Sequence, residues 1–227
     1  MTRRIVAIRP EPGLTETLTR AHHMGLRVTG LPLSQAEPVG WTPPAVAYDG
    51  LLVGSANVFR HGGSELEKLR DVPVLAVGER TADAARRTGW RVEATGEGGL
   101  QALLDALPAQ PRRLLRLAGE QRVELAVPDS VEIDTVTLYR MRHHQVTPAQ
   151  GALFSRGSVV LLHSGEAAAH FARECERSGI ERNALSLAAL APRIAEAAGP
   201  GWGKVRVAPA PNDAALLAIA GELCESP

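Results

Sequence analysis

A buried strand that runs directly into a helix is the feature that most constrains this chain. Val74 to Val77 are four apolar residues without polar alternation, a pattern typical of a strand buried on both faces of a parallel sheet. Gly78 ends the strand, and a helix rich in alanine and arginine is predicted to follow and to end at Gly89. The first turn of such a helix has free N–H groups at the carboxyl edge of the sheet, and they form an anion site beside Thr81. A routine strand-to-helix turn explains the same residues, so this stretch alone leaves both interpretations open.

Composition indicates a globular α/β protein of one large or two small domains. The 227 residues are 44% hydrophobic and 22% charged but only 4% aromatic, which predicts an aliphatic, alanine-rich core. A formal net charge of +0 argues against a nucleic-acid partner. Cys175 and Cys224 lack metal-ligand spacing and are typical of free thiols in a reducing compartment. The N-terminus lacks the apolar core of a signal peptide and no apolar run is long enough to span a membrane, so we expect a cytoplasmic protein.

The strand-helix pattern occurs twice, which predicts two similar parallel-sheet α/β domains. Four pairs of positions match at nearly constant separation, and they are Ser55 with Ser164, Thr81 with Ile194, Val92 with Val207, and Leu103 with Leu216. The second series lacks a starting strand and helix of its own, which residues 5–33 can supply. We therefore expect residues 1–36 and 146–227 to form one discontinuous domain and residues 37–145 an inserted one. The chain then crosses between domains near residues 33–38 and 139–146.

The inserted domain is predicted to end with two further strands. Residues 113–117 form the first, and a short helix is expected to follow and to end at Val127. Residues 131–139 alternate polar and apolar side chains, as a half-exposed strand does. A polar continuation follows as far as Gln145.

A series of short motifs extends over nearly the whole chain. They are Arg9-Pro10, Pro32-Leu33, Val53-x-Ser55-Ala56-Asn57-Val58, Ala76-Val77-Gly78-x-x-Thr81-Ala82, Gly119-x-x-Arg122, Val136-x-x-Tyr139-Arg140, Ser164, and Asn212-Asp213-Ala214-Ala215-Leu216. In this order and spacing they resemble the uroporphyrinogen-III synthase family of tetrapyrrole biosynthesis. The resemblance implies two flavodoxin-like α/β domains joined by a two-stranded linker, with the substrate in a cleft between them. It also implies that no metal or organic cofactor is needed.

The resemblance further implies the reaction and its proton donor. Hydroxymethylbilane, a linear tetrapyrrole, is cyclised with inversion of ring D and loss of water. This chemistry needs a proton donor near the leaving hydroxyl and an enclosed site for a flexible substrate. Tyr139 matches the family's tyrosine at the domain junction and is the expected donor. A linker tyrosine that packs its ring against a domain face is the alternative.

Six further residues are expected to bind the carboxylates of the substrate. Ser55, Asn57 and Thr81 belong to predicted helix starts of the inserted domain, and Ser164 occupies the matching place in the other domain. N-capping is an alternative role for Ser55, Asn57 and Thr81, and it is compatible with carboxylate binding. Arg9 and Arg122 lie on predicted loops at the carboxyl edges of the sheets, where ligands bind open α/β sheets.

One position departs from the family pattern. Ile194 stands where the family often has a threonine that mirrors Thr81, so we expect a less polar wall there. No metal site is predicted, because the adjacent pairs His22-His23 and His143-His144 lack a third ligand at usable spacing. We expect a monomer that acts on a small molecule, without a nucleic-acid or membrane partner. A non-catalytic two-domain module that binds a polyanionic ligand is the alternative function.

Overall fold

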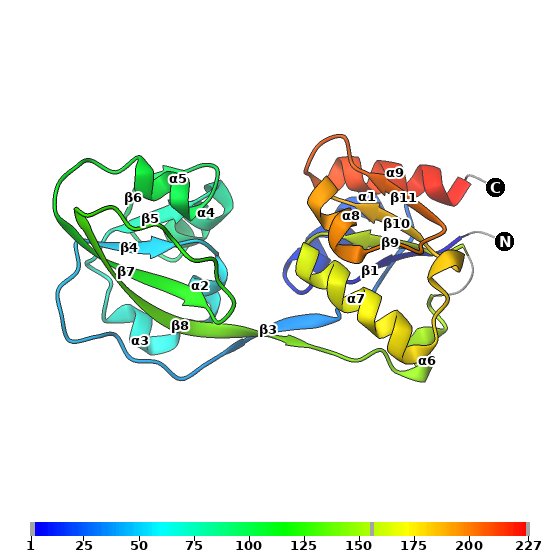
Figure 1. The fold of residues 1–227 in the computed structure, drawn as a ribbon, viewed down its shortest axis with the longest axis horizontal. Coiled ribbons are helices and arrows are strands. Elements are labelled where there is room, and N and C mark those ends of the chain that lie inside the picture. The colour runs from blue at the N-terminus through cyan, green and yellow to red at the C-terminus, as the bar shows by residue number, and fades with distance from the viewer. Residues whose placement is uncertain (1–2, 155–156, 226–227) are drawn as a thin grey trace. The chain divides into compact units, whose positions relative to one another are not determined.

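Strands and helices alternate along most of the chain (Figure 1). The computed structural model describes residues 3–154 and 157–225. The chain divides into two compact units, of which unit 1 comprises Met1–Gln35 with His143–Pro227 and unit 2 comprises Ala36–Arg142. Each unit contains one largely parallel sheet. The predicted fold class, α/β with two parallel sheets, is confirmed.

Unit 1 holds a five-stranded parallel sheet in the order β11-β10-β9-β1-β2. The N-terminal strand β1 pairs with β2 on one side and with β9 on the other, so the first residues share a sheet with the last third of the chain. The strands are β1 (Ile5–Ala7), β2 (Val28–Gly30), β9 (Val159–Leu162), β10 (Ser186–Ala189) and β11 (Lys204–Val207).

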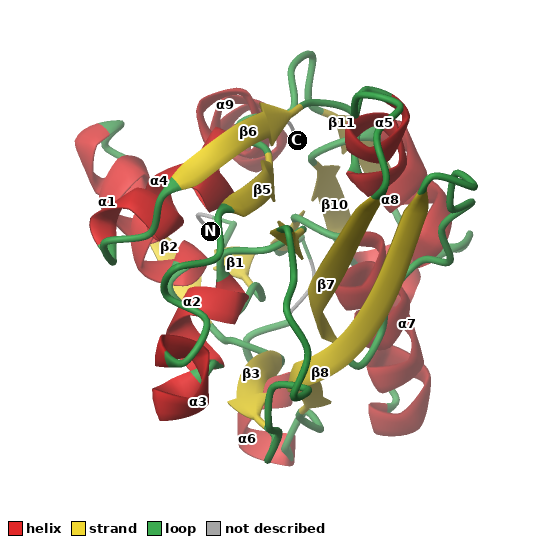
Figure 2. Ribbon diagram, turned by 90° about the vertical axis from the view of Figure 1, so that its left-hand side faces the viewer, coloured by secondary structure: helices red, strands yellow, loops and turns green. Residues whose placement is uncertain are grey.

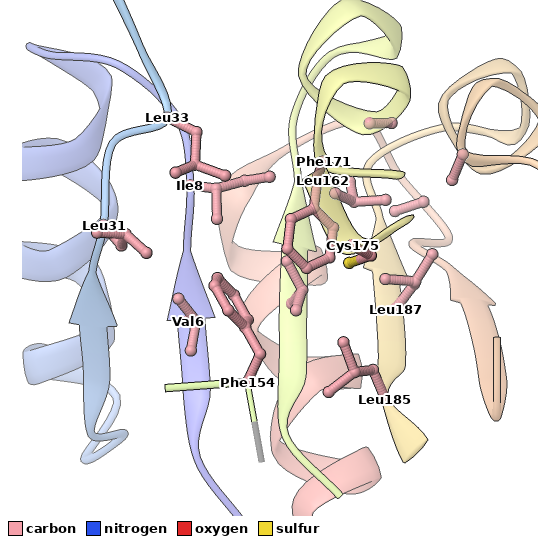
Figure 3. Close-up of a cluster of buried hydrophobic side chains, with 14 of the residues drawn as sticks. Val6, Ile8, Leu31, Leu33, Phe154, Leu162, Phe171, Cys175, Leu185 and Leu187 are labelled. Atoms are coloured by element: carbon pink, nitrogen blue, oxygen red, sulfur yellow. The ribbon is translucent and has the colours of Figure 1, made fainter. Parts of the chain in front are cut away.

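Apolar clusters cover both faces of this sheet. On one face, Val6 and Leu162 contribute to a cluster with Phe171 and Cys175 of α7, and Figure 3 shows these side chains between strands and helix. On the other face, the cluster joins residues of β1, β9 and β10 to helices α1 and α9. The helical segments are α1 (Gly13–His23), α6 (Pro148–Gly151), α7 (Gly165–Ser178), the short 3₁₀ helix η1 (Arg182–Ala184), α8 (Pro192–Ala198) and α9 (Asp213–Glu225).

Unit 2 is built on a six-stranded sheet in the order β3-β8-β7-β4-β5-β6. The five strands from β8 to β6 are parallel, and β7 and β8 lie side by side in Figure 2. The strands are β3 (Ser34–Pro38), β4 (Gly50–Val53), β5 (Val74–Val77), β6 (Val92–Gly96), β7 (Arg112–Gly119) and β8 (Val131–His143). Strand β5 (Val74–Val77) therefore lies inside a parallel sheet between β4 and β6, as its apolar run predicts.

The two faces of the unit 2 sheet are covered unequally. One face packs against α2 (Asn57–His61), α3 (Gly63–Glu67) and α4 (Glu79–Arg87). In the cluster on the other face, α5 (Leu100–Asp105) is the helix that contributes, together with Leu125 from the loop between β7 and β8. The short helix predicted to end at Val127 is wrong, because residues 122–128 have no regular structure. Val123 and Val127 are exposed, so this segment has no continuous apolar face to pack as a helix.

Within residues 3–154 and 157–225, no helix combines the length and the apolar character that a membrane span requires.

The backbone conformation at residue 78 requires a glycine. Its φ of 74° and ψ of 147° lie in a region that only glycine adopts readily, and this conformation turns the chain from β5 into α4. A Cβ at this position would meet nothing within 4 Å, so the constraint comes from the dihedral angles and not from crowding.

We expect Gly78→Ala to lower the free energy of unfolding by about 1–3 kcal/mol, the usual cost of a strained backbone region. Gly40→Ala is the matched control, because a Cβ there also meets nothing within 4 Å and the φ of Gly40 is not positive. Urea unfolding of both variants measures the difference. Equal stabilities of the two variants would show that the Gly78 backbone is not a constraint.

Candidate functional site

A pocket of about 160 Å³ lies at the carboxyl ends of β4 and β7 in unit 2. This edge is where ligands bind in open parallel sheets. Three residues selected from the sequence, Ser55, Arg122 and Tyr139, come together here. The other lining residues are Gly54, Leu100, Arg116, Leu117, Ala118, Gly119, Gln121 and Val123.

The ring of Tyr139 lies directly against Gly119. The register of β7 and β8 shifts between Ala118 and Gly119, which pairs Gly119 with Tyr139. A Cβ on residue 119 would lie 2.8 Å from Cε2 and Cζ of the tyrosine ring, so only glycine leaves room for it. The irregular pairing and the missing side chain together place the phenol at the pocket.

A histidine that the sequence analysis did not select lies beside this phenol. The rings of His61 and Tyr139 are tilted with centroids 6.1 Å apart. Burial, followed by the charge of Arg60, lowers the pKa of His61. The imidazole near Tyr139 is therefore mainly uncharged at neutral pH.

Arg122 and Ser55 are held by local hydrogen bonds. Arg122 Nη1 donates to Thr137 Oγ1 at 3.0 Å and, more weakly, to the carbonyl oxygens of Gly119 and Glu120 at 3.4 Å. These bonds keep the exposed arginine at the pocket mouth. Ser55 Oγ accepts the N–H of Asn57 at 3.2 Å, so it supports the start of α2 while it lines the pocket.

Arg116 is the pocket residue that the sequence analysis missed. It lies on β7 between β4 and β8, and only 6% of it is exposed. Its Nε is buried without a hydrogen-bond partner, and no ion pair to it is formed by any residue that the structure describes. Burial lowers the pKa of its guanidinium, and the charge of Arg122 lowers it further. A lone arginine within the otherwise apolar stretch of β7 was the signal in the sequence.

Two predicted binding residues of unit 2 lie outside the pocket lining. Asn57 is the first residue of α2, and its Oδ1 accepts a hydrogen bond from Arg60 Nη1 at 3.1 Å. Thr81 is buried in the first turn of α4. Ile194, its counterpart in α8, is also buried and packs into a core cluster of unit 1. The matched position is thus interior in both units, which is why isoleucine is accommodated there.

Ser164 and Arg9 belong to unit 1, where both have local partners. Ser164 is the N-cap of α7, and its Oγ accepts the N–H of Ala167 at 3.2 Å. Arg9 Nη1 donates to both carboxylate oxygens of Asp213 at 3.2 Å and to Thr17 Oγ1 at 3.1 Å. Arg9 is thus part of a partly buried network at the carboxyl edge of the unit 1 sheet.

Asp213 is the centre of that network. Thr17 Oγ1 donates to its Oδ2 at 2.8 Å, and His163 Nε2 lies 3.1 Å from its Oδ1. Burial raises the pKa of Asp213, but the hydrogen bonds from His163 and Thr17 and the positive charges around it outweigh burial and lower the pKa to about 2. The network therefore stabilises the ionised carboxylate.

In the part of the chain that the structure describes, no group of three or more His, Cys, Asp or Glu side chains is placed to hold a metal ion.

A family model described as Uroporphyrinogen-III synthase HemD matches residues 16–218. The solved uroporphyrinogen-III synthetase of Helicobacter pylori matches with a TM-score of 0.65 and 15% identity, over 97% of this chain and 99% of that chain. A mutant uroporphyrinogen III synthase of Thermus thermophilus matches with a TM-score of 0.54 and 15% identity, over 97% and 98% respectively. The comparison with curated proteins gave no match.

The network around Asp213 makes a pH-dependent contribution to stability. Because its folded-state pKa is depressed, the stabilisation is present above the unfolded-state pKa and is lost as pH falls through about 2. We expect Asp213→Asn to lower the free energy of unfolding at pH 7 by about 2 kcal/mol, and the deficit to shrink steadily below about pH 4. Urea unfolding across this pH range measures it, with Asp129→Asn at an exposed turn as control. A deficit that does not change with pH would contradict the assignment.

Proposed function

The chain belongs to the uroporphyrinogen-III synthase family, and from this premise we propose how its residues convert hydroxymethylbilane into uroporphyrinogen III. The reaction closes a linear tetrapyrrole with inversion of ring D and loss of water. One observation carries the proposal: the unit 2 pocket combines a phenol, a hydroxyl and arginine side chains at one sheet edge. These are a proton donor and the groups that bind carboxylates, which this substrate presents along its length.

Tyr139 is the proposed acid. It donates its hydroxyl proton to the leaving hydroxyl of the substrate, so that water departs and a cationic azafulvene (azafulvenium) forms. The substituted carbon of ring D attacks this azafulvene, and the resulting spiro intermediate fragments and closes again with ring D inverted. The proton released at closure restores the phenol, so the step is balanced. The neutral His61 beside the ring adds no positive charge that would oppose formation of the cationic azafulvene.

Arg122 and Ser55 are the proposed binding groups around the acid. Arg122 is exposed at the pocket and its hydrogen-bond partners are neutral oxygens, so its charge is available to a carboxylate. Ser55 has a hydroxyl hydrogen left to donate, because its Oγ acts as the acceptor toward Asn57. The substrate-binding roles of Arg9, Asn57, Thr81 and Ser164 stay predictions.

The proposal also covers the domains, the oligomeric state, the localisation and the partners of the enzyme. Units 1 and 2 are the proposed domains, and one copy of the chain is the proposed active form, because the pocket is lined by residues of a single unit. We place the enzyme in the cytoplasm, which suits the free thiols of Cys175 and Cys224. We propose no nucleic-acid partner, consistent with the balanced charge of the chain.

The isomer formed from hydroxymethylbilane tests the activity directly. Spontaneous closure gives uroporphyrinogen I, so only a working catalyst enriches isomer III. We expect isomer III to dominate when the purified chain is added to freshly generated hydroxymethylbilane. Isomer I alone, with measurable binding of the substrate, would instead favour the non-catalytic binding module.

Tyr139→Phe tests the proposed acid. We expect turnover to fall by about 10²-fold, the lower end of the usual contribution of general acid catalysis, because azafulvene formation is chemically easy. KM should change little, since the ring remains against Gly119.

Tyr48→Phe is the matched control for this variant. Tyr48 is the other tyrosine of the chain, and its hydroxyl donates to Asp134 at 2.8 Å, away from the pocket lining. We expect its turnover to match the unmodified enzyme. Unchanged turnover in Tyr139→Phe would remove Tyr139 from the mechanism.

A further inference from the structure

We propose that Arg116 and Arg122 form a carboxylate-binding subsite within unit 2, which takes one carboxylate side chain of the substrate. The identity of this ligand rests on the proposed function. The anion site itself rests on the burial, partners and position of Arg116.

Arg116 is a buried cation without a counter-ion. Only 6% of it is exposed, and its Nε has no hydrogen-bond partner among the described residues. Buried charges in proteins are normally paired, because an unpaired one loses its hydration without compensation. Even the more exposed Arg113 on the same strand has a counter-ion, with Nε and Nη2 donating to Asp134 Oδ2 at 3.2 and 3.0 Å. The missing partner of Arg116 is therefore expected to be a ligand.

The position of Arg116 determines the chemistry of that ligand. Arg116 and Arg122 line the same pocket, so two positive charges act on whatever enters it. A guanidinium binds a carboxylate through two parallel N–H groups, which satisfies both its charge and its geometry. Leu100 and Val123 provide apolar walls for the methylene groups of a short carboxylate arm. The pocket volume of about 160 Å³ suits such an arm.

The access to Arg116 follows from how the sheet is covered. Arg116 shares its face of β7 with Leu114, which packs in the cluster under α5. Residues 122–128, which continue over this face, form a loop and not a helix. Part of the face stays uncovered there, and Leu100 and Val123 line the pocket that results. In unit 1, α1 and α9 cover the corresponding face, and Arg9 there is bound to Asp213. An arginine whose charge and Nε–H have no partner among the described residues is thus a feature of the unit 2 sheet.

A titration of the isolated protein tests the anion site without turnover. The Nε–H resonance of Arg116 is assigned by comparing ¹⁵N spectra of the unmodified protein and Arg116→Lys. We expect propionate to shift this resonance saturably, whereas propionamide, its neutral isostere, leaves it in place. A response to inorganic phosphate but not to propionate would overturn the carboxylate assignment. A response to none of the probes would overturn the anion site.

Enzyme kinetics and stability measurements together test whether the substrate binds at this subsite. We expect Arg116→Met to raise KM for hydroxymethylbilane about 10-fold to 100-fold, the usual loss for a hydrogen bond to a charged group. It should change kcat by less. The same variant should unfold at equal or higher urea concentration, because it removes a buried charge that has no partner. Arg116→Lys keeps the charge and should recover part of the affinity.

Arg113→Met is the matched control on the same strand. It breaks the ion pair with Asp134 at an exposed site, so KM should stay unchanged while stability falls slightly. An unchanged KM in Arg116→Met, or a loss of stability in that variant, would overturn the proposal. If the enzyme forms no isomer III, the proposed function fails, and the propionate titration still decides whether the subsite exists.

Discussion

Burial of both faces of a parallel sheet is the constraint on which the rest of this structure depends. The central strands bury mainly apolar side chains on both faces, so each face must be covered by helices or by a loop with apolar side chains. In unit 1, helices cover both faces. In unit 2 one face is covered by α5 and by the loop after β7, and that lighter cover is what leaves a pocket at the end of the sheet. The site is therefore a consequence of the connection between β7 and β8.

The buried guanidinium in that pocket is unfavourable for folding and favourable for binding. A charge without a partner destabilises the native state, and a ligand that supplies the partner regains that energy on binding. The depressed pKa of Arg116, caused by burial and then by Arg122, expresses the same cost in the isolated chain. Unit 2 therefore has its unsatisfied charge where a carboxylate can enter.

Sequence reasoning succeeded where local patterns determine structure and failed where distant residues do. The apolar run of β5 and the repeated strand-helix order predicted the fold class correctly. The helix expected before Val127 was wrong, because only the folded sheet shows that this segment has no apolar face to bury. The partner of Arg9 could not be predicted, since Asp213 is far away in the sequence. Arg116 was missed because a sequence does not show which buried arginine lacks a carboxylate.

The two units satisfy the charges at their sheet edges in opposite ways. In unit 1, Arg9, Thr17 and His163 surround the ionised Asp213, so the positive charge of Arg9 is compensated within the fold. In unit 2, Arg116 and Arg122 meet no carboxylate among the described residues, although they occupy the same edge of a similar sheet. Binding energy for an anion comes from charges that the fold has not already neutralised. Of these two sheet edges, the unit 2 pocket is therefore the one whose arginines are not already neutralised by a carboxylate of the fold.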